Sequence, residues 1–314
     1  MAAGTKKNKR LHWCLCLFSL FLSILAVEVY LNLINYPYQN CESIINTSEK
    51  YLGDFNSELG WLYKKTISYY DYHRKYDYHF DGDGIRVKQP NYKIDYSKPR
   101  IIFIGGSVTF GEQLNYEDTF VAQIGRLLEK EFEVVNLGVQ GYGAGQSMIR
   151  LKKMIEGIDP QYVVYTFIPD HVNRVANHDR RLQVKCATFP GTKPVFTVRD
   201  KKLKLIRTPQ TYDLVDRYKS LLLMKMSYEN LREENWKKSG KDQQVTKEIV
   251  NQITSLTQES GAKDYFIYYD TVHDWSPSSW HNHELNYLFG SDKKERVLNF
   301  TNWAQDSKPA GTKY

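Results

Sequence analysis

A short apolar run that ends in two glycines and a serine constrains this chain more than any other feature. Residues 100–111 read RIIFIGGSVTFG. Ile101 to Ile104 have the length and apolar character of a buried β-strand, which Gly105 and Gly106 end just before Ser107. Glycine at such a turn leaves room for a substrate and tolerates unusual backbone angles. The pattern predicts a serine hydroxyl on a sharp turn at the carboxyl edge of a sheet, as a nucleophile needs, although a plain turn with a capping serine has the same letters.

The segments after Ser107 alternate between strand and helix. Apolar or aromatic runs typical of strands cover residues 132–137, 162–167 and 265–269. Apolar spacing also predicts a helix capped by Asp118 and helices over residues 148–155, 212–233 and 248–256. Strands and helices joined by short glycine-rich turns form βαβ units. We therefore expect an α/β fold of three layers, α/β/α, around a mainly parallel sheet.

Each of the first three predicted strands ends in a glycine-rich or polar turn. Ser107 follows the first strand, residues 136–143 follow the second, and residues 170–173 follow the third. The carboxyl ends of parallel strands meet at one edge of the sheet, where ligands of open α/β sheets usually bind. We therefore expect these three turns to converge on one site.

Two of these turns carry motifs of a known family. Over residues 97–174 the chain resembles the SGNH hydrolases, also called the GDSL family, whose first block reads Gly-Asp-Ser-x-Thr-x-Gly. The turn after the first strand matches this block, except that Gly106 stands at the Asp position. The second block, an Asn followed five residues later by a Gly, is matched by Asn136 and Gly141. The resemblance implies that Ser107 is the nucleophile and that the backbone N–H of Gly141 binds the oxyanion.

The third block of the family matches less well. The family has Gly-x-Asn-Asp after the third strand, and the Asn side chain donates to the oxyanion. Asp170 stands near the Asn position here, and an ionised carboxylate accepts hydrogen bonds but cannot donate them. Asn173 follows three residues later and carries a donor. We predict that Asp170 and Asn173 belong to the site, while two solvated loop residues are the plainer alternative.

The fourth block should supply the base, because a serine hydroxyl needs a neutral imidazole to take its proton. The family has Asp-x-x-His there. Asp306 matches the Asp, but no histidine follows His283, and Lys308 is a cation at neutral pH. Either the segment that carries the base is missing from the chain, or a histidine from another loop replaces it. We predict His281 as the base; the other candidates are His171, His273 and His283.

The same loop raises the question of a metal. His281 and His283 with a nearby acid could contribute to a zinc site, but His-x-His alone lacks the third and fourth ligands. We therefore predict neither a metal nor a cofactor.

The motifs predict a serine esterase whose substrate is an acyl ester of a polysaccharide or a lipid. Two alternatives stay open. An O-acyltransferase of the same fold would pass the acyl group to a sugar hydroxyl instead of water. A catalytically inactive relative would bind glycans through tyrosines, which gather in residues 63–84. That stretch also reads as a ragged β-hairpin lying on the domain.

The N-terminus reads as a single-pass membrane anchor. Residues 11–34 are nearly all apolar and long enough to span a bilayer, and a basic cluster within residues 1–10 precedes them. The cluster should stay in the cytoplasm, which places the rest of the chain in the periplasm or outside the cell. A cleaved signal peptide is the alternative, although the small residues of a cleavage site are poorly placed.

This organisation divides the chain into four parts. They are the basic N-terminus at 1–10, the anchor at 11–34, an aromatic-rich lead-in region at 35–96, and an SGNH-like domain at 97–314 whose C-terminal end we expect to be truncated or degenerate. Four charges of the formal net charge of +7 lie in the N-terminus, and the other basic residues form no stripe, which excludes nucleic acid as a partner. Cys41 and Cys186 are the two cysteines beyond the anchor, so one disulfide can form.

Overall fold

Five neighbouring parallel strands form the centre of the fold. The computed structural model describes residues 2–36, 52–71, 75–184, 189–212, 217–269, 285–290 and 295–300. Within them lies a sheet of eight strands in the order β12-β11-β8-β6-β7-β5-β4-β3. The parallel strands are β12 (Val297–Asn299), β11 (Lys263–Tyr268), β8 (Tyr162–Phe167), β6 (Arg100–Ile104) and β7 (Glu133–Asn136). The predicted α/β fold with a mainly parallel sheet is confirmed.

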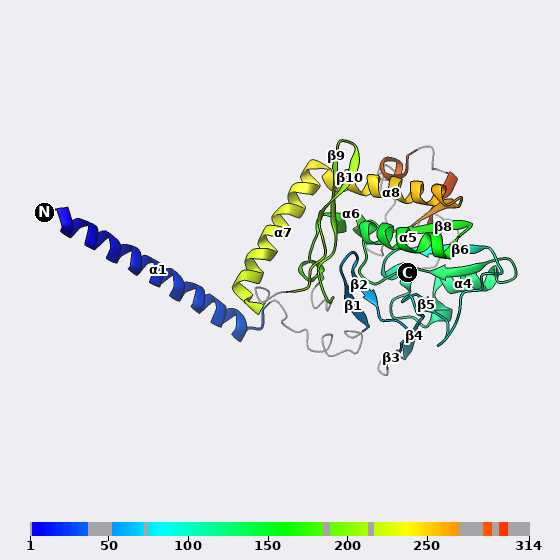
Figure 1. Cartoon of the computed structure of the whole chain (residues 1–314), viewed down its shortest axis with the longest axis horizontal. Helices are drawn as coiled ribbons and strands as arrows, with labels where there is room; N and C mark the ends of the chain where they lie inside the picture. The colour runs from blue at the N-terminus through cyan, green and yellow to red at the C-terminus, as the bar shows by residue number, and fades with distance from the viewer. Residues whose placement is uncertain are drawn as a thin grey trace, which may run out of the picture.

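The apolar side chains of the central strands alternate between the two faces of this sheet, so each face carries its own core cluster. Ile102 and Ile104 of β6 belong to the core cluster that contains α5 (Ala144–Ile158) and α8 (Lys241–Glu259). Ile101 and Phe103 point to the other face, into the cluster that contains α4 (Phe120–Leu127). Successive strand residues face opposite sides, so one apolar run fills both interfaces. This arrangement gives the three layers that are visible in Figure 1.

The helix ends differ from the expected ones in two places. The N-cap of α4 is Thr119 and not Asp118, because the Thr119 hydroxyl accepts from the Ala122 N–H at 3.2 Å. Asp118 instead ends a short 3-10 turn, η2 (Tyr116–Asp118). The two helices predicted at residues 212–233 and 248–256 have other bounds: α7 covers Lys219–Ser239, and α8 begins at Lys241. Gly240, in the left-handed region with φ of 66°, separates them.

The lead-in region extends the same sheet with antiparallel strands. These are β3 (Ser68–Asp71), β4 (Tyr76–Phe80) and β5 (Arg86–Val87), of which β5 pairs with β7. Residues 63–84 contain the hairpin of β3 and β4 as predicted, but this hairpin continues the central sheet and does not lie on the domain. Tyr69, Tyr76 and Tyr78 are buried in an aromatic cluster, and Tyr70 is the exposed tyrosine among the described residues of this stretch. Most of the described tyrosines of this stretch therefore contribute to a core and are not exposed as a sugar-binding surface would require.

The remaining elements lie around the sheet. They are the hairpin β1 (Gly53–Asn56) and β2 (Gly60–Tyr63), the hairpin β9 (Val195–Arg199) and β10 (Lys202–Arg207), and the short helices α3 (Ser107–Phe110), α6 (Asp170–Ala176) and η3 (Arg180–Leu182).

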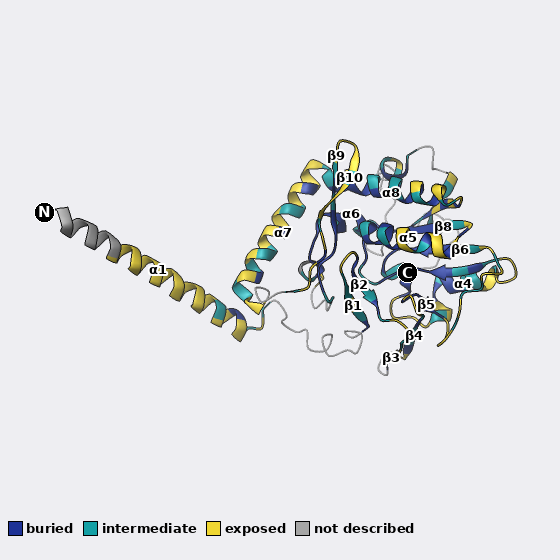
Figure 2. Cartoon of the chain, in the orientation of Figure 1, coloured by how far each residue is buried: buried dark blue, intermediate teal, exposed yellow. Residues whose placement is uncertain are grey.

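The N-terminal helix α1 (Ala2–Leu33) projects away from the rest of the chain (Figure 1). From Leu11 onward most of its apolar residues are exposed (Figure 2), and Leu31 near its end is buried. Its segment Leu11–Leu33 has 23 residues with a mean hydropathy of 2.3. Among the described residues it is the helix that is long and apolar enough to span a membrane. Cys41 and Cys186 lie outside the described residues, so the disulfide stays a prediction.

Candidate active site

Ser107 lies where the sequence predicts it, on the turn that follows β6. It is the first residue of α3, and Gly106 is the N-cap. Gly105 cannot be replaced easily, because a Cβ there would lie 2.1 Å from the Thr109 hydroxyl oxygen. Ser107 itself is half-buried and faces a pocket described below. The two glycines let the chain reverse within van der Waals contact of Thr109 and present a hydroxyl at the carboxyl edge of the sheet.

The loop of the second block is bonded directly to this turn. The Asn136 side chain donates to the carbonyl oxygen of Thr109 at 2.8 Å and accepts from the N–H of Gly138 at 2.9 Å. The N–H of Val139 donates to the carbonyl oxygen of Gly105 at 3.2 Å. Asn136 therefore joins the two motifs that the sequence places on neighbouring strands.

Gly141 lies under an aromatic cover that sequence reasoning did not find. Its φ is +74°, and a Cβ at this position would lie 2.4 Å from the ring of Phe189. The Phe189 ring stacks on Trp61 with centroids 4.3 Å apart, and the Trp61 indole N–H donates to the carbonyl oxygen of Gln140 at 2.9 Å. Both the backbone conformation and the cover require glycine here. Trp61 comes from β2, so the lead-in region contributes to the site.

Residues 170–173, which follow the third strand, form the start of α6, and Asp170 makes an ion pair within this helix. Its carboxylate accepts from Nε of Arg174 at 2.6 Å. Burial raises the pKa of Asp170, but the charges of Arg174 and Arg180 outweigh this and hold the pKa below its ordinary value. An ionised Asp170 cannot donate to an oxyanion. Its geometry is that of a group that positions Arg174, which the spacing of four residues on a helix could have indicated.

Arg174 and His171 occupy the space beside Gly106. A Cβ on Gly106 would lie 3.2 Å from Nε2 of His171 and 3.4 Å from a terminal nitrogen of Arg174. That terminal nitrogen donates to the carbonyl oxygen of Tyr142 at 2.6 Å. A side chain at position 106 would therefore lie against the Tyr142 carbonyl oxygen, the His171 imidazole and the Arg174 guanidinium. Asn173, from the same helix, is half-buried.

His171 is a neutral, buried imidazole beside the turn of Ser107. Burial lowers its pKa well below the ordinary value, and the charge of Arg174 acts in the same direction. Its Nδ1 lies 2.9 Å from the Tyr165 hydroxyl. Within the described residues Nε2 has no hydrogen-bond partner, although it is buried. One ring nitrogen is therefore held, and the other is directed at the backbone next to the candidate nucleophile.

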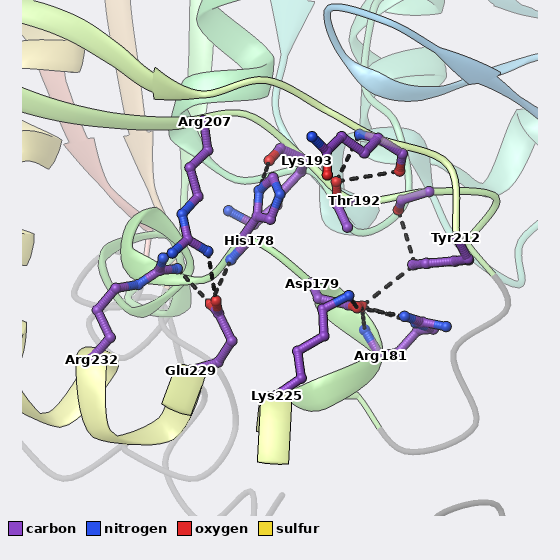
Figure 3. A network of polar contacts seen from close by, with 12 residues as sticks. His178, Asp179, Arg181, Thr192, Lys193, Arg207, Tyr212, Lys225, Glu229 and Arg232 are labelled. Atoms are coloured by element: carbon purple, nitrogen blue, oxygen red, sulfur yellow. Dashed lines mark hydrogen bonds and ion pairs between the residues drawn. The ribbon is translucent and has the colours of Figure 1, made fainter. Parts of the chain in front are cut away.

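A buried polar network behind α6 supports this arrangement (Figure 3). Lys193 is buried, and its Nζ donates to the carbonyl oxygen of Arg174. His178 bonds the carbonyl oxygen of Lys193 through Nδ1 at 2.7 Å, and Glu229 of α7 accepts from Arg207 at 2.8 Å. The network connects α6, β10 and α7, so the position of Arg174 depends on all three elements.

The histidines of this region should make the protein less stable in mild acid. Burial lowers the pKa of His178 to about 4, and the bond to Lys193 only partly offsets this. Below its ordinary pKa of about 6.5 the unfolded state binds a proton that the folded state excludes, so stability falls as the pH drops from about 6.5 to 4. The loss from His178 should approach about 3 kcal/mol at one pKa unit per 1.36 kcal/mol.

Urea unfolding of the detergent-solubilised chain at pH 7, 5.5 and 4.5 measures this effect. His178→Gln keeps a donor for the carbonyl oxygen of Lys193 but cannot take up the proton, so its stability should fall less across this range than that of the unchanged protein. Equal slopes in the two proteins would contradict the assignment.

An apolar pocket of about 720 Å³ opens beside Ser107. Side chains from α4 and from the ends of β8, β11 and β12 line it, and most of them are apolar or aromatic. They include Val108, Leu114, Phe120, Ile124, Leu127, Thr166, Ile267, Tyr269, Leu298 and Phe300. A pocket of this size and character suits the apolar part of a small-molecule or acyl substrate.

Several predicted site residues lie outside the described part of the chain. They are His281 and Asp306, together with His273 and His283. Among the described residues, no group of three or more His, Cys, Asp or Glu side chains could hold a metal ion.

Arg86, which lies outside the four motif blocks, supports the segment that follows Ser107. It is buried, and its guanidinium donates to the carbonyl oxygens of Phe110, Gly111 and Leu114 at 2.6, 2.7 and 2.5 Å. These carbonyls follow Ser107 directly, so Arg86 holds the C-terminal side of the turn. A buried arginine on a short strand gives no local pattern from which this contact could be read.

Comparisons with known proteins add little to this geometry. No family model matches the chain, and no curated protein matches it. Among solved structures, the crystal structure of TesA aligns with a TM-score of 0.35 and 11% sequence identity, covering 68% of this chain and 85% of that one. A likeness of this size carries no conclusion about function.

Proposed function

We propose that the protein is a membrane-anchored serine esterase of the SGNH type, which cleaves acyl esters outside the cytoplasm. One observation carries the proposal: Ser107 lies on a glycine turn at the carboxyl edge of a parallel sheet and borders an apolar pocket of about 720 Å³. A hydroxyl at the mouth of an apolar pocket is the arrangement that acyl transfer to serine requires.

In this proposal the Ser107 hydroxyl attacks the ester carbonyl, and the acyl group enters the pocket. The backbone N–H groups of Ser107 and Gly141 bind the oxyanion, at about 2.7 to 4 kcal/mol for each donor. Because Asp170 is ionised and bonded to Arg174, it is not a third donor. Asn173 keeps that proposed role, since its amide has no hydrogen-bond partner within the described residues.

The proton of Ser107 must pass to an imidazole, directly or through a water. His281 stays our proposed base, with Asp306 as its orienting carboxylate. His171 is the alternative, because a neutral imidazole with an unpaired Nε2 beside Gly106 has the protonation state that a base needs. Alanine variants of the two histidines separate these possibilities, since only the true base should be needed for labelling of Ser107.

The position of the pocket bears on the substrate. The pocket is lined by α4, which lies at the opposite end of the molecule from α1 (Figure 1). A substrate therefore reaches Ser107 from the aqueous side and not directly from the bilayer that α1 would cross. This favours an acyl ester on a polysaccharide over one on a lipid of that membrane.

A fluorophosphonate probe tests the nucleophile. The detergent-solubilised full chain should become labelled, and Ser107→Ala should abolish labelling. Ser227→Ala, which removes an exposed serine on α7, serves as the control and should be labelled like the unchanged protein. Labelling that persists in Ser107→Ala would refute Ser107 as the nucleophile. A protein that is not labelled at all would support the inactive relative.

A further inference from the structure

Helix α7 has an apolar face that is solvent-exposed in the described part of the chain. Its buried residues Leu222, Glu229 and Trp236 recur every seven positions and so lie on one side of the helix. Trp236 belongs to the core cluster of the domain, and Glu229 pairs with Arg207 of β10. A second row is solvent-exposed and apolar, with exposed fractions of 40, 69, 57 and 61% for Leu221, Met224, Tyr228 and Leu231. The spacing of three and four residues places these four side chains in one stripe along the helix, which we call the outer stripe.

The start of α7 is bonded to α1. The Glu28 carboxylate accepts from the backbone N–H groups of Lys219 and Ser220, each at 2.8 Å, and from the Ser220 hydroxyl at 2.7 Å. The Tyr36 hydroxyl lies 3.9 Å from the Met226 sulfur. An acidic side chain that accepts from the first N–H groups of a helix is a stabilising cap. The first turn of α7 therefore lies at the level of Glu28.

The level of Glu28 can be placed relative to a bilayer. A hydrocarbon core of about 30 Å corresponds to about 20 helical residues at 1.5 Å each. The apolar segment Leu11–Leu33 has 23 residues, and Glu28 precedes its end by five, or roughly 7 to 8 Å along the axis. Glu28 and the first turn of α7 thus lie near the boundary between hydrocarbon and headgroups.

The course of α7 brings the outer stripe along that boundary. Figure 1 shows α7 between α1 and the remainder of the domain, running across the direction of α1 and not continuing it. Its inner side is held by Glu229, which pairs with Arg207 of β10, and by Arg232, which donates to the carbonyl oxygen of Ala176 in α6. A helix that starts at the membrane boundary and crosses the direction of the anchor runs along the membrane surface.

We propose that the outer stripe of α7 rests on the outer leaflet of the bilayer that α1 crosses, with Leu221, Met224, Tyr228 and Leu231 in the headgroup and upper acyl region. Aliphatic and tyrosine side chains are typical of surface-lying helices. The docking rests on the membrane anchor of the proposed function but not on its esterase activity. It holds the domain in one orientation, with the Ser107 pocket remote from the bilayer.

Environment-sensitive labels test the docking. In a background with serine at all four native cysteines, Met224→Cys and Leu231→Cys carry an NBD fluorophore, and the full chain is reconstituted into phosphatidylcholine vesicles that contain doxyl-labelled lipid. Asn230→Cys, on another exposed part of α7, is the matched control. We expect blue-shifted emission at 224 and 231 and at least twofold stronger doxyl quenching than at 230.

The outcomes separate the parts of the proposal. Water-like emission at all three positions, with the protein retained in vesicles after alkaline carbonate washing, would overturn the docking alone. Loss of the protein on washing would overturn the anchor and the docking together. Cross-linking between copies at 224 without doxyl quenching would show that a second copy covers the stripe and would also overturn the docking. Fluorophosphonate labelling of the same vesicles reports on the esterase separately.

Discussion

Replacing Arg86 by methionine should destabilise the protein by about 2 to 5 kcal/mol, because it leaves the carbonyl oxygens of the buried residues Phe110 and Gly111 unpaired, at about 1 to 3 kcal/mol each. The guanidinium satisfies the carbonyl oxygens of Phe110, Gly111 and Leu114, and it lies 4.6 Å from the Tyr78 ring centroid and 4.8 Å from that of Phe110. Methionine fills much of the space that the arginine side chain occupies, but it leaves these carbonyl oxygens without a hydrogen-bond donor. Labelling of Ser107 should fall as well, since the turn loses its support.

Urea unfolding of the solubilised full chain measures the effect. Arg86→Lys should give an intermediate loss, because an ammonium keeps the charge but cannot reach several carbonyls with one planar group. Arg199→Met is the matched control at an exposed arginine and should change stability by less than about 0.5 kcal/mol. If Arg86→Met unfolds at the same urea concentration as Arg199→Met, Arg86 does not hold the turn.

Gly141→Ala should cost about 2 to 5 kcal/mol, from two separate effects. A left-handed backbone costs about 1 to 2 kcal/mol for a residue with a Cβ, and crowding in a packed site adds about 1 to 3 kcal/mol. At Gly141 the φ is +74° and the new Cβ would lie 2.4 Å from the Phe189 ring. The loop would have to move away from Trp61 and Phe189, which should also reduce labelling of Ser107.

Gly157→Ala provides the matched control for this substitution. Gly157 lies within α5, and a Cβ there would have no neighbour within 4 Å. Alanine in a helix is favoured over glycine, so this variant should be as stable as the unchanged protein or up to about 1 kcal/mol more stable. If Gly141→Ala unfolds at the same urea concentration as Gly157→Ala, the loop around Gly141 accommodates the added methyl group without strain, and the prediction is wrong.

The local pattern of the chain was enough to predict the class of fold and the position of Ser107 on a glycine turn after a strand. The strand β6 and its glycine turn were predicted from a few neighbouring residues, as were β7, β8 and β11. Apolar side chains repeat along a helix or a strand with the period of that element. A short stretch of sequence is therefore enough to predict a strand, a helix or the apolar segment of α1. The turns around Ser107 and Gly141 were found for the same reason.

Only the tertiary structure decided how distant segments complete the site. Trp61 covers Gly141, Arg86 holds the turn after Ser107, and His171 fills the space that Gly106 leaves open. It also decided that most of the described tyrosines of residues 63–84 contribute to a core and that Asp170 pairs with Arg174. Such contacts join residues that share no repeat in the chain, and many pairings are compatible with the same local pattern. Which pairing forms depends on the close packing and hydrogen bonding of the whole domain, because buried polar groups and voids are costly wherever they occur.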